Sequence, residues 1–125
     1  MASLSYFRKT ETSAGDGFAD QIYITNLGHA KLRVINVQCV EDVARISVEI
    51  ISKGASHDRT KPTTETISLM HNITQNAIET DIGWEGDIDL AADQDLRVTF
   101  LNVTAGVLFA AAKTLIATVG FEYLG

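Results

Sequence analysis

Apolar and polar residues alternate with a period of two along most of the chain from Gln21 onward. Because successive side chains of a β-strand point to opposite faces, this period indicates strands with one buried face. The alternating runs fall at residues 21–26, 31–40, 43–52, 65–71, 77–83, 84–90, 96–103 and 115–123. About eight short strands separated by turn residues predict an all-β fold, an antiparallel β-sandwich or jelly roll.

The runs also predict which side chains face the core. In 31–40, strict alternation puts Leu32 and Ile35 on opposite faces of the strand. Only Glu41 and Asp42 separate this run from 43–52, so we expect the two strands to form a hairpin. The inward side chains of the second strand are then Ala44, Ile46, Val48 and Ile50.

Three further features bear on the fold: the stretch 106–114, two aromatic residues and the single cysteine. Residues 106–114 contain three consecutive alanines, and the pattern leaves open a short helix or an edge strand with a loop. Trp84 and Tyr123 fall on the apolar faces of their strands, so we expect both to pack in the core. The single cysteine, Cys39, cannot form an internal disulfide, and we expect a buried, inert thiol.

The first twenty residues lack a period of 2 or 3.6 and are rich in Ser, Thr, Ala and Gly. We therefore expect residues 1–20 to form an extended N-terminal arm, and residues 21–125 to form the β-sandwich domain. The polar stretch 53–64 is long for a loop, which suggests a contact surface.

Composition and charge argue against several classes of function. The 125 residues carry a net charge of −6, and residues 63–125 hold only two Lys and Arg against nine Asp and Glu. A nucleic-acid-binding protein needs a basic face, so we expect no nucleic-acid partner. The most apolar window, 103–119, contains Lys113 and three threonines, so we expect no membrane span. Because the N-terminus has no apolar signal region, we expect a soluble protein that does not enter a secretory route.

Catalytic chemistry finds little support in the sequence. The candidates are His29, His57 and His71, and Ser56-His57-Asp58 has the residue types of a catalytic triad. Adjacent residues cannot build a triad, because its side chains must converge from separate segments. We therefore predict a non-enzymatic protein with no catalytic residue and no cofactor.

Six acidic residues lie close together in the sequence: Asp81, Glu85, Asp87, Asp89, Asp93 and Asp95. Asp93 and Asp95 can supply two calcium ligands from a turn, but calcium takes six to eight oxygen ligands. Glu85, Asp87 and Asp89 share one strand face, which disperses charge instead of wrapping an ion. We predict a solvated or partner-facing acidic surface and no metal, with calcium as the alternative.

The segment from Gly83 to Tyr123 carries a resemblance to a known group of proteins. It reads G-W-E-G-D-I-D-L-A-A-D-Q-D-L-R-V-T-F-L-N-V-T-A-G and, after an insertion, ends I-A-T-V-G-F-E-Y. This order of strands and glycine turns resembles small β-sandwich structural proteins of tailed bacteriophages, namely capsid decoration (cement) proteins and related head or tail accessory proteins. The bulkier stretch Val107–Thr114 departs from the short hairpin expected there.

The resemblance implies a virion structural protein that binds the capsid surface and stabilises the head. Its partners would be the major capsid protein or other virion proteins, and it would form a homo-oligomer. It would be located in the virion, and in the host cytoplasm during assembly. The alternative is a carbohydrate- or receptor-binding β-sandwich module of a phage tail. Partner contacts are expected in the arm and the long loop: Tyr6, Phe7, Arg8, Lys9, His57 and Arg59.

Overall fold

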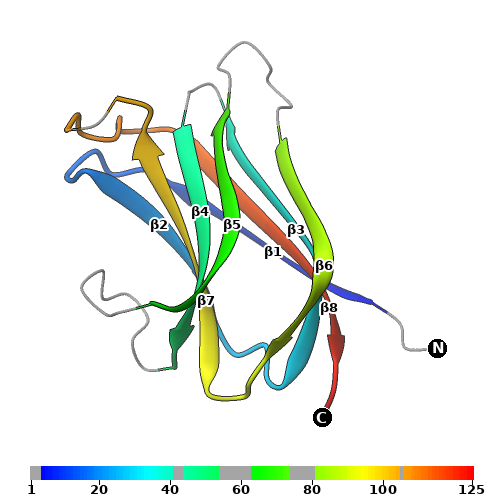
Figure 1. Ribbon diagram of the computed structural model, residues 1–125. Helices are drawn as coiled ribbons and strands as arrows, with labels where there is room; N and C mark the ends of the chain where they lie inside the picture. The colour runs from blue at the N-terminus through cyan, green and yellow to red at the C-terminus, as the bar shows by residue number, and fades with distance from the viewer. Residues whose placement is uncertain (1–3, 41–43, 54–62, 74–80, 105) are drawn as a thin grey trace.

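The computed structural model describes residues 4–40, 44–53, 63–73, 81–104 and 106–125, which form two packed antiparallel sheets (Figure 1). The eight strands are β1 (Ser5–Thr12), β2 (Ala19–Ile24), β3 (Ala30–Val40), β4 (Ala44–Ser52), β5 (Thr63–Ile73), β6 (Asp81–Leu90), β7 (Gln94–Asn102) and β8 (Thr114–Tyr123). One sheet has the order β1-β8-β3-β6 and the other has the order β2-β7-β4-β5. The predicted all-β sandwich is confirmed.

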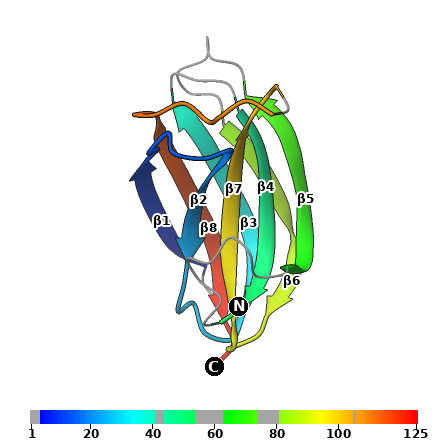
Figure 2. The ribbon, with the colours of Figure 1, turned by 90° about the vertical axis from the view of Figure 1, so that its left-hand side faces the viewer.

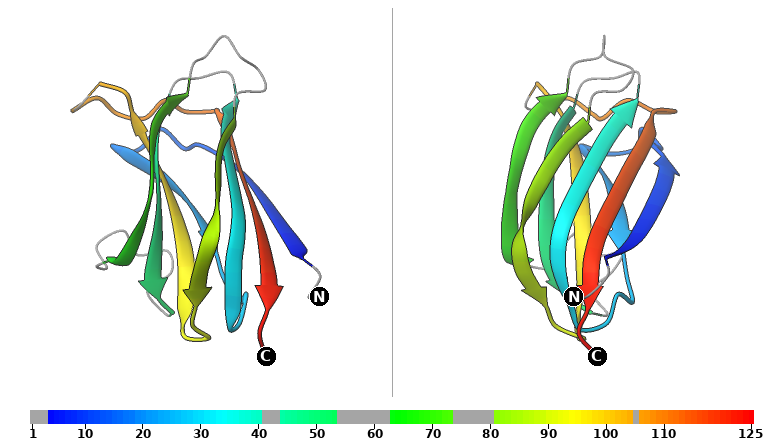
Figure 3. Two further views of the ribbon diagram at one scale, coloured as in Figure 1. Left: turned by 45° about the vertical axis from the view of Figure 1, so that its right-hand side comes forward. Right: turned by 90° about the vertical axis from the view of Figure 1, so that its right-hand side faces the viewer.

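The strand pairs are nested along the chain, which identifies the sandwich as a jelly roll. β1 pairs with β8, β2 with β7, β3 with β6 and β4 with β5, all antiparallel. Figure 2 shows the face of the β2-β7-β4-β5 sheet, and the right-hand view of Figure 3 shows the other sheet. The start of β1 and the end of β8 lie at one end of the sandwich, opposite the β1–β2 and β7–β8 loops (Figure 1).

The core fills the space between the two sheets. The predicted inward side chains of β4 are all buried, and so are Leu96, Val98 and Phe100 of β7. Cys39 is buried in the core cluster, as expected. Trp84 packs against this cluster while remaining partly exposed. The fully buried side chains include Ile22, Ile24, Ile35, Ile46, Leu90, Leu96 and Phe100.

Strand β3 departs from strict alternation at a β-bulge. The register against both neighbouring strands shifts between Leu32 and Val34. A bulge inserts one extra residue, so the side chains beyond it change face. Leu32 and Ile35 therefore both point into the core, where strict alternation placed them on opposite faces.

The expected hairpin between residues 31–40 and 43–52 is wrong. β3 and β4 follow each other in the chain but belong to different sheets. The chain crosses from one sheet to the other between them, which is how a jelly roll connects its two sheets.

The first twenty residues contain extended chain, but Ser5–Thr12 belongs to the sandwich itself. β1 pairs along its whole length with β8, from Ser5 opposite Phe121 to Thr12 opposite Thr114. β2 begins at Ala19, before the boundary that we expected between arm and sandwich. The separate arm of residues 1–20 is therefore replaced by an edge strand, a loop and the start of β2.

Two further expectations are settled near the C-terminus. The described part of 106–114 contains turns and no helix, so the helical alternative is wrong. Tyr123 is 64% exposed and not in the core, because it lies at the end of β8, where its ring covers Gly28.

Across the part of the chain that the structure describes, no helix has the length and apolar character needed to cross a bilayer.

Candidate interaction surfaces

Two loops from distant parts of the sequence are joined by hydrogen bonds at one end of the sandwich. Ser13, which follows β1, donates its backbone N–H to the carbonyl of Lys113 at 2.9 Å and accepts from the N–H of Ala112 at 2.9 Å. Its buried hydroxyl donates to the carbonyl of Ala110 at 2.6 Å and accepts from the N–H of Lys113 at 2.9 Å. One serine therefore fixes the β7–β8 loop to the β1–β2 loop.

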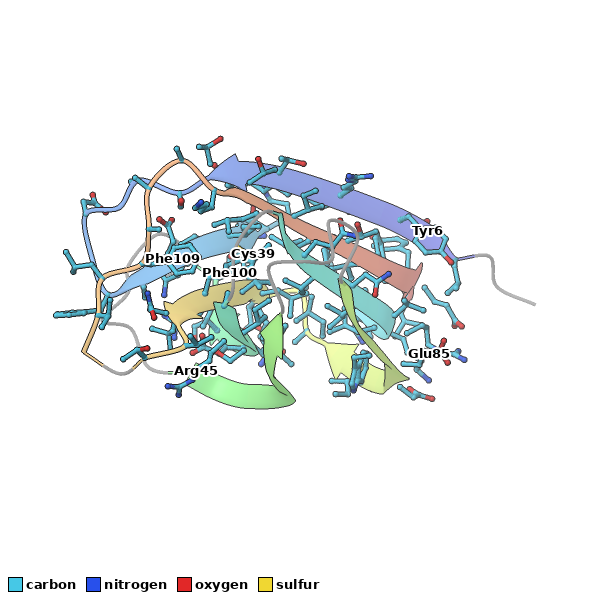
Figure 4. All side chains as sticks on the ribbon, turned by 90° about the horizontal axis from the view of Figure 1, so that it is seen from above. Tyr6, Cys39, Arg45, Glu85, Phe100 and Phe109 are labelled. Atoms are coloured by element: carbon cyan, nitrogen blue, oxygen red, sulfur yellow. The ribbon has the colours of Figure 1, made fainter. Side chains whose placement is uncertain are left out.

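Phe109 anchors this unit in the core. Its side chain is 2% exposed, and its ring lies 6.3 Å from the ring of Phe100 in a tilted arrangement (Figure 4). Its backbone N–H donates to the carbonyl of Gly17 at 3.1 Å, which joins the two loops a second time. Because Phe109 points inward, the neighbouring Leu108 is left on the outside.

The outer surface of the joined loops is apolar, and we call it the loop-end surface. Its exposed apolar side chains are Phe18, Val103, Val107 and Leu108. A hollow of about 280 Å³ adjoins them, lined by Phe18, Arg45, Leu101, Asn102, Thr104, Gly106 and Val107. Phe18 is 59% exposed. Exposed apolar side chains that gather on one surface are typical of contact sites, so the loop-end surface is a candidate.

The side chain of Asn102, which lines the hollow, is held by the loop backbone. The Asn102 carboxamide accepts the N–H of Thr104 at 2.8 Å and donates to the carbonyl of Leu108 at 3.3 Å. Arg45 projects from β4 at this end of the molecule (Figure 4). The hollow thus combines an aromatic ring with a carboxamide of set orientation and a basic side chain.

The four partner-contact residues predicted in the first twenty positions lie on β1. Tyr6, Phe7 and Arg8 are exposed at the edge of the sheet. Lys9 is turned toward the second sheet, where its ammonium group donates to the carbonyl of Tyr23 at 2.9 Å. The other two predicted contacts, His57 and Arg59, lie outside the described residues, and the contact role of all six stays a prediction.

The acidic residues are placed in different environments. Glu85, Asp87 and Asp89 are exposed along β6, and Asp87 lies 3.5 Å from the ammonium group of Lys31. Asp93 is exposed in the β6–β7 turn, whereas Asp95 is buried and accepts the N–H of Asn26 at 3.4 Å. The two residues considered for calcium therefore do not share one solvent-facing site. Among the described residues, no three His, Cys, Asp or Glu side chains gather to hold a metal ion.

Of the three histidines considered for catalysis, the structure describes the side chain of His29. It is exposed in the β2–β3 connection, and its carbonyl accepts the N–H of Leu124 at 2.8 Å. Ser56, His57 and Asp58 lie outside the described residues, as does the side chain of His71. The structure therefore does not test a triad at these positions.

Sequence reasoning missed the loop-end surface. The sequence places Phe18 in an arm and leaves residues 106–114 open between a short helix and an edge strand with a loop, so it does not indicate their contact. The available signal was the combination of Val107, Leu108 and Phe109 with small residues on both sides. Because loops run over the protein surface, three adjacent bulky residues in one loop favour at least one exposed apolar side chain.

Comparisons with known proteins show a distant likeness in fold. No protein-family model matches the chain, and no curated protein matches it in sequence. One similar solved structure comes from Bacillus endospore appendages, described as a novel family of disulfide-linked pili. It has 13% identity and a TM-score of 0.42, over 98% of this chain and 90% of that one.

A second similar structure comes from the infectious bursal disease virus Gx strain. It has 11% identity and a TM-score of 0.42, over 100% of this chain and 37% of the viral chain. This protein therefore spans little more than a third of the viral chain. The resemblance to decoration proteins of tailed phages stays a prediction.

Proposed function

We propose that this protein is a non-enzymatic structural component of a virion, a decoration protein that binds the capsid surface and stabilises the head. The observation that supports this function is the loop-end surface, where apolar side chains are exposed on two loops that hydrogen bonds join to each other. An apolar surface that is already ordered loses little conformational entropy when it binds a partner. Such a surface suits a protein that adds many equivalent contacts to a lattice.

The charge of the molecule fits the same role. A net charge of −6 keeps the free protein soluble despite its exposed apolar side chains. The same charge steers it toward a basic surface on a partner. We expect the apolar contact to hold the protein in place and the acidic residues to guide its approach.

Labelling of particles tests this function. An antibody against the purified chain should label the heads of virus particles from the source culture in immunogold electron microscopy. Label on tails would favour the alternative function, and particles without label would contradict both.

A pair of variants then tests the surface. Phe18→Ser combined with Leu108→Ser should leave the fold intact and abolish cosedimentation of the protein with purified particles. The matched control is Leu124→Ser, an exposed apolar residue at the opposite end of the sandwich. Equal loss of binding in the control would show that the loop-end surface is not the contact.

The alternative function, a carbohydrate- or receptor-binding module of a phage tail, is supported by the hollow itself. An exposed aromatic ring beside fixed polar groups is the usual arrangement for binding a sugar. In this case Phe18 would stack on the ligand, and Arg45 and Asn102 would bind its hydroxyl groups. A glycan array followed by titration with Arg45→Ala tests it: glycan binding that the substitution weakens supports the module, and an array without binding contradicts it.

A further inference from the structure

We infer that copies of this protein join edge to edge, with β1 of one copy pairing with β6 of the next. The contact would continue the β1-β8-β3-β6 sheet from one subunit into the following one. This inference deepens the proposed structural role by naming a second copy of the chain as a partner. It involves a different part of the molecule from the loop-end surface.

The two edges are available for such pairing. Within the described residues, the sheet ends at β1 on one side and at β6 on the other. Figure 4 places Tyr6 on β1 and Glu85 on β6, at opposite edges of the sheet. An edge strand presents a row of backbone N–H and C=O groups that can pair with a further strand.

The strand directions match for copies related by simple translation. β1 is antiparallel to β8, β8 to β3, and β3 to β6. β1 and β6 therefore run in opposite directions, as the right-hand view of Figure 3 allows the reader to follow. A copy shifted sideways along the sheet brings its β1 antiparallel to β6 of its neighbour, with both outer faces on the same side.

The charges on the two edges are of opposite sign on the same face. Arg8 on β1 lines a hollow of about 200 Å³ on the outer face of the sheet, together with Asn36 and Thr118. On β6, the exposed side chains of Glu85, Asp87 and Asp89 alternate with Trp84, Ile88 and Leu90, which point toward the core. Opposite charges across a strand pair are stabilising, so these edges attract each other.

Charge also disfavours the pairing of either edge with itself and the pairing of β6 with β2. Two β1 edges would bring Arg8 against Arg8, and two β6 edges would bring six carboxylates together. The edge of the second sheet at β2 carries Asp20 and no Lys or Arg, so it does not complement β6. Of these combinations, β1 with β6 is the attractive one, and the exposed Tyr6 and Phe7 add apolar area to that contact.

A contact between two different edges repeats from copy to copy. Such a head-to-tail contact produces a ring if the rotation between subunits closes, and an open chain if it does not. The sheet would then run through every subunit, and each copy would use both edges.

Charge reversal at the two edges tests the inference by analytical ultracentrifugation of the full chain. Arg8→Glu and Glu85→Lys should each lower the association constant about fivefold or more, as attraction becomes repulsion. The double variant, with both changes in one chain, should restore association. The matched controls are Lys53→Glu and Asp93→Lys, exposed charges away from both edges, which should associate like the unmodified chain.

A second variant tests the backbone pairing directly. The N–H of Ser13 points toward the β8 side, where it donates to the carbonyl of Lys113. Successive N–H groups along a strand point to opposite sides, so the N–H of Thr10, three residues earlier, points to the outer edge. Thr10→Pro removes that donor without touching the β1–β8 ladder and should leave a folded monomer. Thr10→Val keeps the donor and should associate normally.

Three results would overturn the inference. They are an unmodified chain that stays monomeric at every concentration, a double charge variant that stays dissociated, and a Thr10→Pro protein that still associates. None of them bears on the labelling of particles or on binding through Phe18 and Leu108, so the proposed function is judged separately.

Discussion

The guanidinium Nη2 of Arg97 lies 2.6 Å from Oε2 of Glu49, on the outer face of the β2-β7-β4-β5 sheet. The two side chains are only 6% and 14% exposed, although the alternation of β4 and β7 points them away from the core. Glu49 also accepts the hydroxyl of Thr99 at 2.6 Å and the Nε of Arg97 at 3.2 Å. The hydrogen bond to Glu49 raises the pKa of Arg97 above its ordinary value, against the opposing effect of burial, so this residue stays charged.

Removing one member of this pair should destabilise the fold. Glu49→Leu leaves the buried Arg97 charge without its carboxylate and should lower the free energy of unfolding by about 3–5 kcal/mol. Replacing both residues, Glu49→Leu with Arg97→Met, should recover most of that loss, because an apolar pair of similar volume fills the same space. Urea denaturation measures both values. A double variant no more stable than the single one would show that the charges do not act as a pair.

Phe109 should be as important for stability as a residue of a core strand. Phe109→Ala removes a ring that packs against Phe100 and should cost about 3–5 kcal/mol. The adjacent Leu108→Ala is the control, because Leu108 is exposed and should change stability by less than about 0.5 kcal/mol. Thermal unfolding of the two variants distinguishes them. Equal stability would mean that the β7–β8 loop does not pack on the core.

Truncation distinguishes an edge strand from an arm. Deleting residues 2–12 removes β1 and its hydrogen bonds to β8, and should lower the free energy of unfolding by more than about 1 kcal/mol. Deleting only residues 2–3, before β1, should leave stability unchanged. Chemical denaturation compares the two. A protein that loses residues 2–12 without loss of stability would restore the interpretation of this segment as an arm.

The sequence predicts strands and inward faces well, because both depend on local periodicity. Ile46 and Val48 alternate with polar neighbours and are buried as expected. Which strands pair with each other depends on residues that are distant in the sequence. The alternation within a strand is the same whichever strand it pairs with. The period of two therefore could not show that β3 and β4 lie in different sheets, nor that a bulge turns both Leu32 and Ile35 inward.

The interaction surfaces were less predictable than the fold. β1 shows no alternation, because it is an edge strand that is largely exposed and joins the sheet through its backbone. Leu108 and Phe109 are equally apolar in the sequence, and only the contact with Phe100 decides which of them is buried. Tyr6, Phe7 and Arg8 could be singled out as contact residues, but the edge on which they lie became visible only with the pairing of β1 and β8.

The spacing of Trp84 and Gly86 has a steric basis. A Cβ atom on Gly86 would overlap the indole ring of Trp84, which packs against the core from the same face of β6. Gly86→Ala should therefore push the ring away from the core and cost about 1–3 kcal/mol, as overpacking usually does. The neighbouring Asp87→Ala is the control, because its ion pair with Lys31 is exposed and contributes little.

Fluorescence measures the movement of the ring directly, since Trp84 is the single tryptophan of the chain. We expect a red-shifted emission maximum for Gly86→Ala, because displacement exposes the indole to water, and an unchanged maximum for Asp87→Ala. Unchanged emission and stability in both variants would mean that the indole does not lie over Gly86. Because β6 is also the edge inferred to receive β1 of the next copy, a displaced Trp84 should weaken association at the same time.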